Sequence, residues 1–209
     1  MNPDDFLAMW AAGTAAGGAV VVWWRIVGLG YTWLVAASVV MLALGAAALD
    51  RGITAVVGAV TVGAAALLAR IARAAATSLA GGSVVLMVEH WSLATIAGAL
   101  MLGAITSELL LGHWYLVDPR LPRWALRSLA AAAALAALVE VALVGGYREV
   151  GANPWGLILA GTTALLMFGV FLALRRRGYR PVMAATGLSY LALLTGLGAT
   201  GAVRLLPGA

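Results

Sequence analysis

Cysteine is absent from the 209 residues of the chain. That absence excludes structural disulfides, thiolate nucleophiles, covalent c-type haem attachment, and iron–sulfur or zinc sites that depend on cysteine ligands. Lysine is absent as well, so all 13 basic residues are arginine. A chain without lysine cannot form the Schiff base on which retinal and pyridoxal phosphate proteins depend. A bundle of seven helices built from this chain would therefore not be a rhodopsin.

Charge is also scarce, at 10% of the residues, whereas 64% are hydrophobic. Soluble domains contain about 25% charged and roughly 45–50% apolar residues. The composition therefore predicts an all-α, polytopic integral membrane helical bundle in the cell membrane, surrounded by lipid. Because a crossing needs about 20 residues, the chain has room for about seven transmembrane helices, with six as the alternative. We expect one transmembrane domain covering residues 1–209 and no soluble domain.

Seven apolar stretches have the length of membrane spans, and aromatic residues and arginines lie near their ends, as in interfacial belts. These stretches are residues 6–24, 31–49, 53–68, 91–113, 124–144, 155–174 and 181–206. Residues 74–90 are harder to interpret. The sequence Gly81-Gly82-Ser83 within them favours a turn or a re-entrant segment, with the next helix beginning as early as Val84, but a helical conformation of residues 74–90 stays open.

The distribution of arginine predicts the orientation. With seven spans, eight arginines lie on the side of the N-terminus and five on the other side. Cytoplasmic loops are enriched in basic residues, so we expect the N-terminus in the cytoplasm, with residues 118–123 and 175–180 on the same side. The net charge of +5 is shared between two membrane faces, so no nucleic acid partner is expected.

Small residues recur at intervals of four along the chain. Such pairs let helix backbones approach closely, which provides van der Waals contact where the hydrophobic force between helices is weak. We interpret these residues as structural: Gly13 with Gly17, Ala94 with Gly98, and Ala99 with Gly103.

Two glutamates lie inside predicted spans, Glu108 in the fourth and Glu140 in the fifth. An ionisable group at the centre of a span costs at least about 2.5–3.5 kcal/mol on insertion scales, so each needs an explanation. The simplest is a carboxyl kept neutral by burial or paired with an arginine. The alternative is that Glu108 and Glu140 form a proton or ion pathway.

The two histidines, His90 and His113, bracket the fourth span at about 34 Å from one another along a straight helix. They cannot bind the same iron. The simplest interpretation is an interfacial imidazole, and the alternative is a haem axial ligand, with Tyr190 as a candidate quinone contact. His90 and Glu140 lie near the same surface and are predicted to pair. We expect no metal site, because the histidines and acids are spread over both leaflets.

No hydrolase or transferase motif is present, and we expect no catalytic activity of the chain's own. The leading hypothesis is an integral membrane subunit of a larger assembly, energy-converting or electron-transferring, whose partners are other membrane subunits or further copies of the chain. Haem b or quinone is the candidate cofactor. The alternative hypothesis is a small proton-coupled transporter or channel that uses Glu108 and Glu140.

Overall fold

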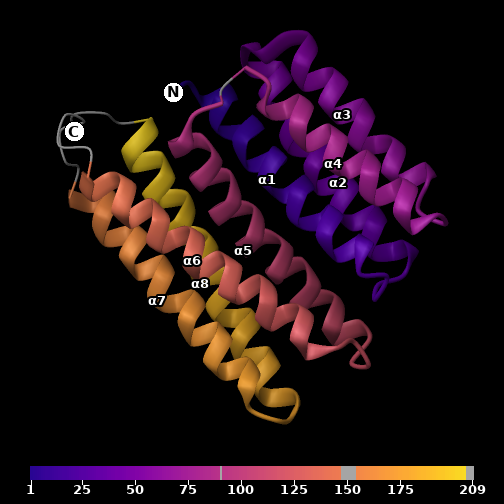
Figure 1. Cartoon of the computed structure of the whole chain (residues 1–209), viewed down its shortest axis with the longest axis vertical. Helices are drawn as coiled ribbons and strands as arrows, with labels where there is room; N and C mark the ends of the chain where they lie inside the picture. The colour runs from indigo at the N-terminus through magenta and orange to yellow at the C-terminus, as the bar shows by residue number, and fades with distance from the viewer. Residues whose placement is uncertain (90, 147–153, 206–209) are drawn as a thin grey trace. The chain divides into compact units, whose positions relative to one another are not determined.

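The computed structural model describes residues 1–89, 91–146 and 154–205 of the chain (Figure 1). Within these ranges the regular secondary structure is entirely helical. Six of the described helices are long and apolar enough to cross a membrane. The prediction of an all-α, polytopic membrane bundle is therefore confirmed, and the number of full-length spans is the alternative count of six.

Seven of the eight described α-helices follow the predicted spans, with ends that differ by a few residues, whereas α4 lies where no span was predicted. Two of the helices, α3 and α4, have 16 residues each and are about 24 Å long, less than the roughly 30 Å of a bilayer core. In chain order the helices are α1 (Pro3–Trp23), α2 (Leu29–Ala46), the π-helical turn η1 (Ala47–Arg51), α3 (Gly52–Leu67), α4 (Ala72–Met87), α5 (Leu93–Val117), α6 (Arg123–Gly146), α7 (Pro154–Arg175) and α8 (Tyr179–Arg204).

The chain divides into two compact units. One contains residues 2–99, and the other contains residues 100–209 together with Met1, so that α5 contributes to both. The single domain predicted for residues 1–209 stays a prediction.

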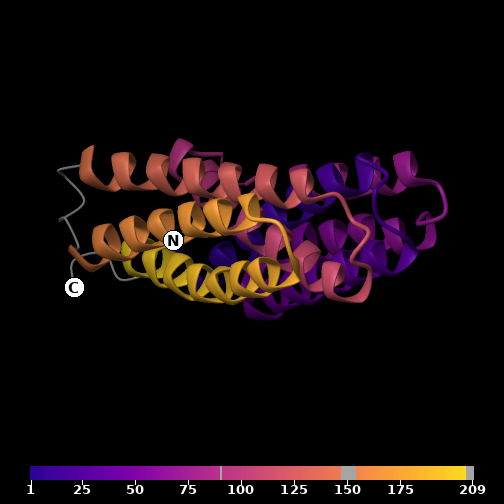
Figure 2. The ribbon, with the colours of Figure 1, turned by 90° about the horizontal axis from the view of Figure 1, so that it is seen from below.

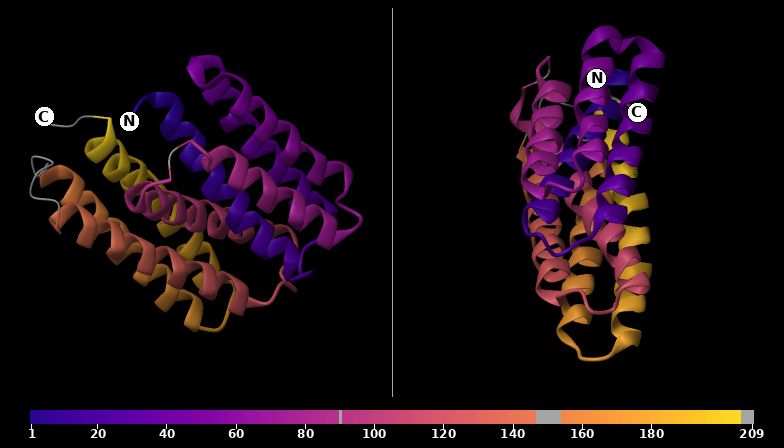
Figure 3. Two further views of the ribbon diagram at one scale, coloured as in Figure 1. Left: turned by 45° about the horizontal axis from the view of Figure 1, so that its top comes forward. Right: turned by 90° about the vertical axis from the view of Figure 1, so that its right-hand side faces the viewer.

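In the unit of residues 2–99, helices α1 to α4 pack as a ring of antiparallel neighbours. Helix α1 lies against α2 and α4, and α3 lies against the same two helices (Figures 1 and 3). Short connections between consecutive helices favour this arrangement, as in other up-and-down helical bundles.

Helix α4 continues through Gly81-Gly82-Ser83, so the turn predicted there is wrong. The glycines permit close packing instead: a methyl group at Gly82 would overlap the side chain of Val62 on α3. The Ser83 hydroxyl donates a hydrogen bond of 2.8 Å to the carbonyl oxygen of Ala12 on α1. In lipid a glycine that would weaken a helix in water is retained because it brings two helices together.

Gly13 has the packing role that its spacing predicts. A methyl group at Gly13 on α1 would overlap the backbone carbonyl of Ala99 on α5, another residue of the predicted small-residue pairs. One turn further along α1, a methyl group at Gly18 would overlap the side chain of Val35 on α2. Helix α1 therefore approaches two neighbours at distances that only glycine permits.

In the unit of residues 100–209, α7 packs along both α6 and α8 (Figure 2). The Thr163 hydroxyl of α7 donates a hydrogen bond of 2.8 Å to the Thr195 hydroxyl of α8. Near one end of this pair, a methyl group at Gly156 would overlap the side chain of Val203. Close backbone approach and one hydroxyl contact thus hold α7 against α8.

Residues 118–123 form the sharp turn that their two prolines predict between α5 and α6. The Asp118 carboxylate accepts a hydrogen bond of 3.1 Å from the backbone of Arg120. The backbone of Leu121 donates a hydrogen bond of 3.3 Å to the Asp118 carbonyl oxygen. This turn fixes α5 and α6 as consecutive helices of the same unit.

Candidate functional site at two buried carboxyl groups

Helix α8 carries a line of buried polar side chains along one face. Successive spacings of three, eleven and four residues place them on that face, because an α-helix repeats every 3.6 residues. Its hydroxyl groups donate hydrogen bonds to carbonyl oxygens four residues earlier in the same helix, which satisfies them without water. The buried polar residues of the line are Thr186, Ser189, Thr200 and Arg204.

Glu108 of α5 meets this line at Ser189. The glutamate is 1% exposed and Ser189 is fully buried. The Ser189 hydroxyl lies within hydrogen-bond distance of a Glu108 carboxyl oxygen and, at 3.0 Å, of the carbonyl oxygen of Ala185. Among the described residues, no arginine forms an ion pair with Glu108. Its partner is a neutral hydroxyl.

The hydroxyl of Ser189 has one proton and faces two oxygen atoms, those of Glu108 and Ala185. Both contacts become hydrogen bonds when the Glu108 carboxyl is protonated and its O–H group donates a hydrogen bond to the Ser189 oxygen. The Ser189 proton is then free to bond the carbonyl oxygen of Ala185. A neutral carboxyl also avoids the cost of a buried, unpaired charge.

Space beside Glu108 depends on Gly112, one turn along α5. A methyl group at Gly112 would lie 3.0 Å from the Thr186 hydroxyl oxygen and 3.9 Å from a Glu108 carboxyl oxygen. The Thr186 hydroxyl donates a hydrogen bond of 3.0 Å to the carbonyl oxygen of Val182. Glu108, Thr186 and Ser189 thus form a small polar seam between α5 and α8.

Glu140 of α6 has a very different partner, the guanidinium of Arg204 at the end of α8. One carboxyl oxygen of Glu140 contacts Nη1 of Arg204, and Nη2 donates a hydrogen bond of 3.1 Å to the other oxygen. The side chains of Arg204 and Glu140 are only 7% and 1% exposed. Two parallel hydrogen bonds between opposite charges make this a bidentate, buried ion pair.

The structure does not bring the two glutamates together. Their partners Ser189 and Arg204 are 15 residues apart on α8, which is about 22 Å of helix. The predicted pathway through both Glu108 and Glu140 therefore has no direct contact between the two carboxyl groups.

Two of the three predicted cofactor residues lie among the described residues, and both are exposed. His113 of α5 is exposed, and Tyr190 of α8 is 50% exposed although its neighbour Ser189 is buried. His90 lies outside the described residues, and so does its predicted pairing with Glu140. In the part of the chain that the structure describes, no three histidine or acidic side chains gather as a metal site would require.

The sequence analysis did not predict the partners of the two glutamates, Ser189 and Arg204. A signal existed for Arg204, because the end of the last helix and the end of the fifth predicted span fall at the same surface. A basic and an acidic residue within two such helices are candidates for a pair. No signal distinguished Ser189 from the other hydroxyl residues of its helix.

No family model, curated protein or solved structure shows a significant match to this chain. The geometry of the two carboxyl groups is therefore the basis for assigning a function.

Proposed function

We propose that this chain moves protons across the membrane and that Glu108 is the group that binds and releases them. The observation that carries the proposal is the hydrogen bonding of Glu108 to the Ser189 hydroxyl, with no ion pair to Glu108 among the described residues. A buried carboxyl with a neutral partner can gain or lose a proton without breaking an ion pair. Buried carboxyl groups inside membrane spans mark proton relays for this reason.

The Ser189 hydroxyl suits both states of the carboxyl. When Glu108 is protonated, the Ser189 oxygen accepts a hydrogen bond from the carboxyl group, and the Ser189 hydroxyl donates to the carbonyl oxygen of Ala185. When Glu108 has released the proton, Ser189 rotates and donates to the carboxylate. The proton enters from one aqueous phase and leaves to the other, so one positive charge crosses the membrane per cycle.

A second hydroxyl lies next to Glu108 in the sequence. Ser107 is fully buried, and its oxygen has no hydrogen-bond partner in the described part of the chain. A buried polar atom of this kind is usually satisfied by an ordered water molecule. Water bound at Ser107 would extend the polar seam along α5.

Proton flux into reconstituted liposomes tests the proposal. With an internal pH-sensitive dye and a potassium diffusion potential, the wild-type protein should acidify or alkalinise the lumen, and Glu108→Gln should abolish that change. Ser189→Ala should slow it. Thr195→Val is the matched control, because Thr195 also donates to a carbonyl oxygen of α8 but contacts no carboxyl. Wild-type flux in a folded Glu108→Gln protein would refute the proposal.

A second candidate function is the subunit of an energy-converting or electron-transfer assembly that contacts haem or quinone. It is favoured by the exposure of His113 and Tyr190, since a cofactor bound at an outer surface would be completed by another chain. A visible spectrum of the protein purified from its native membrane tests it. A Soret band that His113→Ala removes would support this candidate, and an empty visible spectrum would eliminate the haem.

We also propose that the orientation is the reverse of the one predicted from seven spans, with the N-terminus outside the cytoplasm. If helices α3 and α4 both cross the membrane, or together re-enter it, the total number of crossings is even. If both cross, three arginines lie on the side of the N-terminus and ten on the other. The ten are Arg25, Arg70, Arg73, Arg120, Arg123, Arg127, Arg175, Arg176, Arg177 and Arg180.

Basic residues accumulate in cytoplasmic loops, so the turns after α5 and α7 belong in the cytoplasm. Topology reporters inserted at Arg120 and Arg177 should report the cytoplasm, and a tag at the N-terminus should report the opposite side. If the tag and both reporters give the same side, an odd number of crossings separates the N-terminus from α5.

A further inference from the structure

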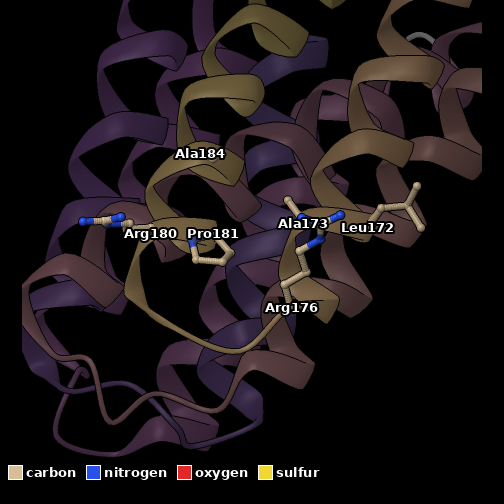
Figure 4. Close-up of a pocket in the computed structure, with 6 residues that line it drawn as sticks. All are labelled: Leu172, Ala173, Arg176, Arg180, Pro181 and Ala184. Atoms are coloured by element: carbon tan, nitrogen blue, oxygen red, sulfur yellow. The ribbon is translucent and has the colours of Figure 1, made fainter.

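An open hollow lies between α7 and α8 at the end where the two helices are joined (Figure 4). Its volume is about 430 Å³, within the roughly 300–1,000 Å³ typical of small-molecule sites. The apolar part of its lining comes from Leu172, Ala173, Pro181 and Ala184. Two arginines complete the lining, Arg176 from the end of α7 and Arg180 from the start of α8.

The turn that frames this hollow is held by Arg123 of α6. Its guanidinium donates hydrogen bonds of 3.0 Å to the Arg176 carbonyl oxygen and 2.8 Å to the Gly178 carbonyl oxygen. The same group donates to the Tyr115 hydroxyl at 3.3 Å and lies 5.9 Å from the centre of that ring. Gly178 has a φ of 118°, a backbone conformation that residues other than glycine rarely adopt. The turn is therefore fixed before any ligand binds.

The positive charge of the hollow is uncompensated. Neither Arg176 nor Arg180 forms an ion pair within the residues that the structure describes, and both side chains are exposed. In Figure 4 the Arg176 side chain lies beside Ala173, whereas Arg180 extends outward from the start of α8. Arg176 is thus the nearer of the two to a ligand in the hollow, and the long stem of Arg180 can bring its charge to the same ligand.

We propose that this hollow binds one anionic phospholipid, with its phosphate at Arg176 and Arg180 and an acyl chain along the apolar lining. The place of the hollow matches the molecule, because the ends of two membrane-spanning helices lie at the depth of lipid headgroups. Arginine binds phosphate through paired N–H groups, which gives it preference for this ligand over a neutral headgroup. Basic pockets between transmembrane helices bind anionic lipid in the same manner.

The proposal is tested by native mass spectrometry of the full-length protein in neutral detergent, titrated with dioleoyl-phosphatidylglycerol or dioleoyl-phosphatidylcholine. The wild-type protein should retain phosphatidylglycerol, the anionic lipid, in preference to phosphatidylcholine. Arg176→Gln should weaken that binding about tenfold or more, as expected for a lost hydrogen bond between charged groups, and Arg180→Gln should weaken it less. Arg177→Gln is the matched control, because it removes the same charge from the same turn but does not line the hollow.

A second pair of variants tests the apolar part of the hollow without changing charge. Ala184 is exposed and lines the hollow, whereas its exposed neighbour Met183 does not. Ala184→Trp should fill the space and reduce binding of phosphatidylglycerol, and Met183→Trp should leave it unchanged. Circular dichroism of each variant confirms that the helices are intact.

Three outcomes would overturn the proposal. Equal losses in Arg176→Gln and Arg177→Gln would mean attraction by the general charge of the turn. Equal retention of the two lipids would mean that phosphate and charge are not recognised. Displacement of phosphatidylglycerol by an equal concentration of soluble glycerol phosphate would mean that the hollow binds a free phosphate compound and not a lipid.

Discussion

Two glutamates are equally buried in the same unit of this protein, and helix α8 supplies the partner of each. Glu108 meets the neutral hydroxyl of Ser189, and Glu140 meets the guanidinium of Arg204. An ion pair fixes the charge of both members, because removing either charge leaves the other buried and unpaired. A hydroxyl partner imposes no such constraint. Burial alone therefore does not distinguish the two carboxyl groups, whereas their partners do, and the proposal that Glu108 exchanges protons depends on that difference.

Replacement of glutamate by glutamine should lower stability strongly at Glu140 and hardly at all at Glu108. The largest effect is therefore expected at Glu140. Glu140→Gln removes one charge of the bidentate pair, so the buried guanidinium of Arg204 loses the carboxylate of Glu140. Breaking a buried pair from one side costs about 3–5 kcal/mol of unfolding free energy. Denaturant unfolding in mixed micelles should show this loss, or the variant should fail to accumulate. A loss below about 1 kcal/mol would mean that the pair contributes little to folding.

Removing both members of the ion pair should cost much less than removing one. In the double variant Glu140→Leu, Arg204→Met no buried charge remains, and replacement of buried ion pairs by apolar residues of similar volume is often neutral or stabilising. We expect the double variant to recover most of the stability lost in Glu140→Gln and to retain proton flux. If it is as unstable as Glu140→Gln, the contacts of Arg204 with its other neighbours matter more than charge pairing.

Ser189→Ala should have a smaller effect on stability. It removes one hydrogen bond between α5 and α8, and such bonds contribute about 0.6 kcal/mol, and at most about 1.7 kcal/mol, inside membranes. Thr195→Val, which removes the hydrogen bond from Thr163 of α7, provides a control of similar size. We expect similar losses of stability in the two variants but slower proton flux in Ser189→Ala alone. Equal proton flux in the two variants would mean that Ser189 has no role in proton transfer.

Glu108→Gln should be almost silent in the unfolding measurement, with a change below about 0.5 kcal/mol. The amide has the shape of a protonated carboxyl and can donate the same hydrogen bond to Ser189. Glu108→Leu cannot, and it should cost about as much as Ser189→Ala. A Glu108→Gln protein as unstable as Glu140→Gln would mean that Glu108 is ionised and paired.

The helical class and most helix positions could be predicted from the sequence because lipid requires long apolar stretches whose backbone groups bond within each helix. The turn predicted at Gly81-Gly82-Ser83 was wrong because the effect of glycine on helices differs in lipid. Rules for glycine derived from soluble proteins treat it as a helix breaker, but in α4 Gly82 lies against Val62 and maintains close packing. Unlike soluble domains, membrane bundles use glycine within helices.

The two carboxyl groups could be selected from the sequence because an ionisable residue inside a span is costly and therefore informative. Their partners could not be selected, because pairing depends on which helix faces meet. Tyr190 was predicted as a quinone contact, yet it is half exposed, and the smaller Ser189 beside it contacts Glu108. A difference of one residue, or 100° around α8, separates the buried face from the exposed one.

Infrared spectroscopy of the carboxyl groups tests most directly the claim that Glu108 carries a proton while Glu140 is ionised. A protonated carboxyl has a C=O stretching band that shifts in heavy water and is absent from a carboxylate. At neutral pH the wild-type protein in lipid should show such a band, Glu108→Gln should remove it, and the folded double variant Glu140→Leu, Arg204→Met should retain it. Retention of the band in Glu108→Gln, or its loss in the double variant, would contradict the account.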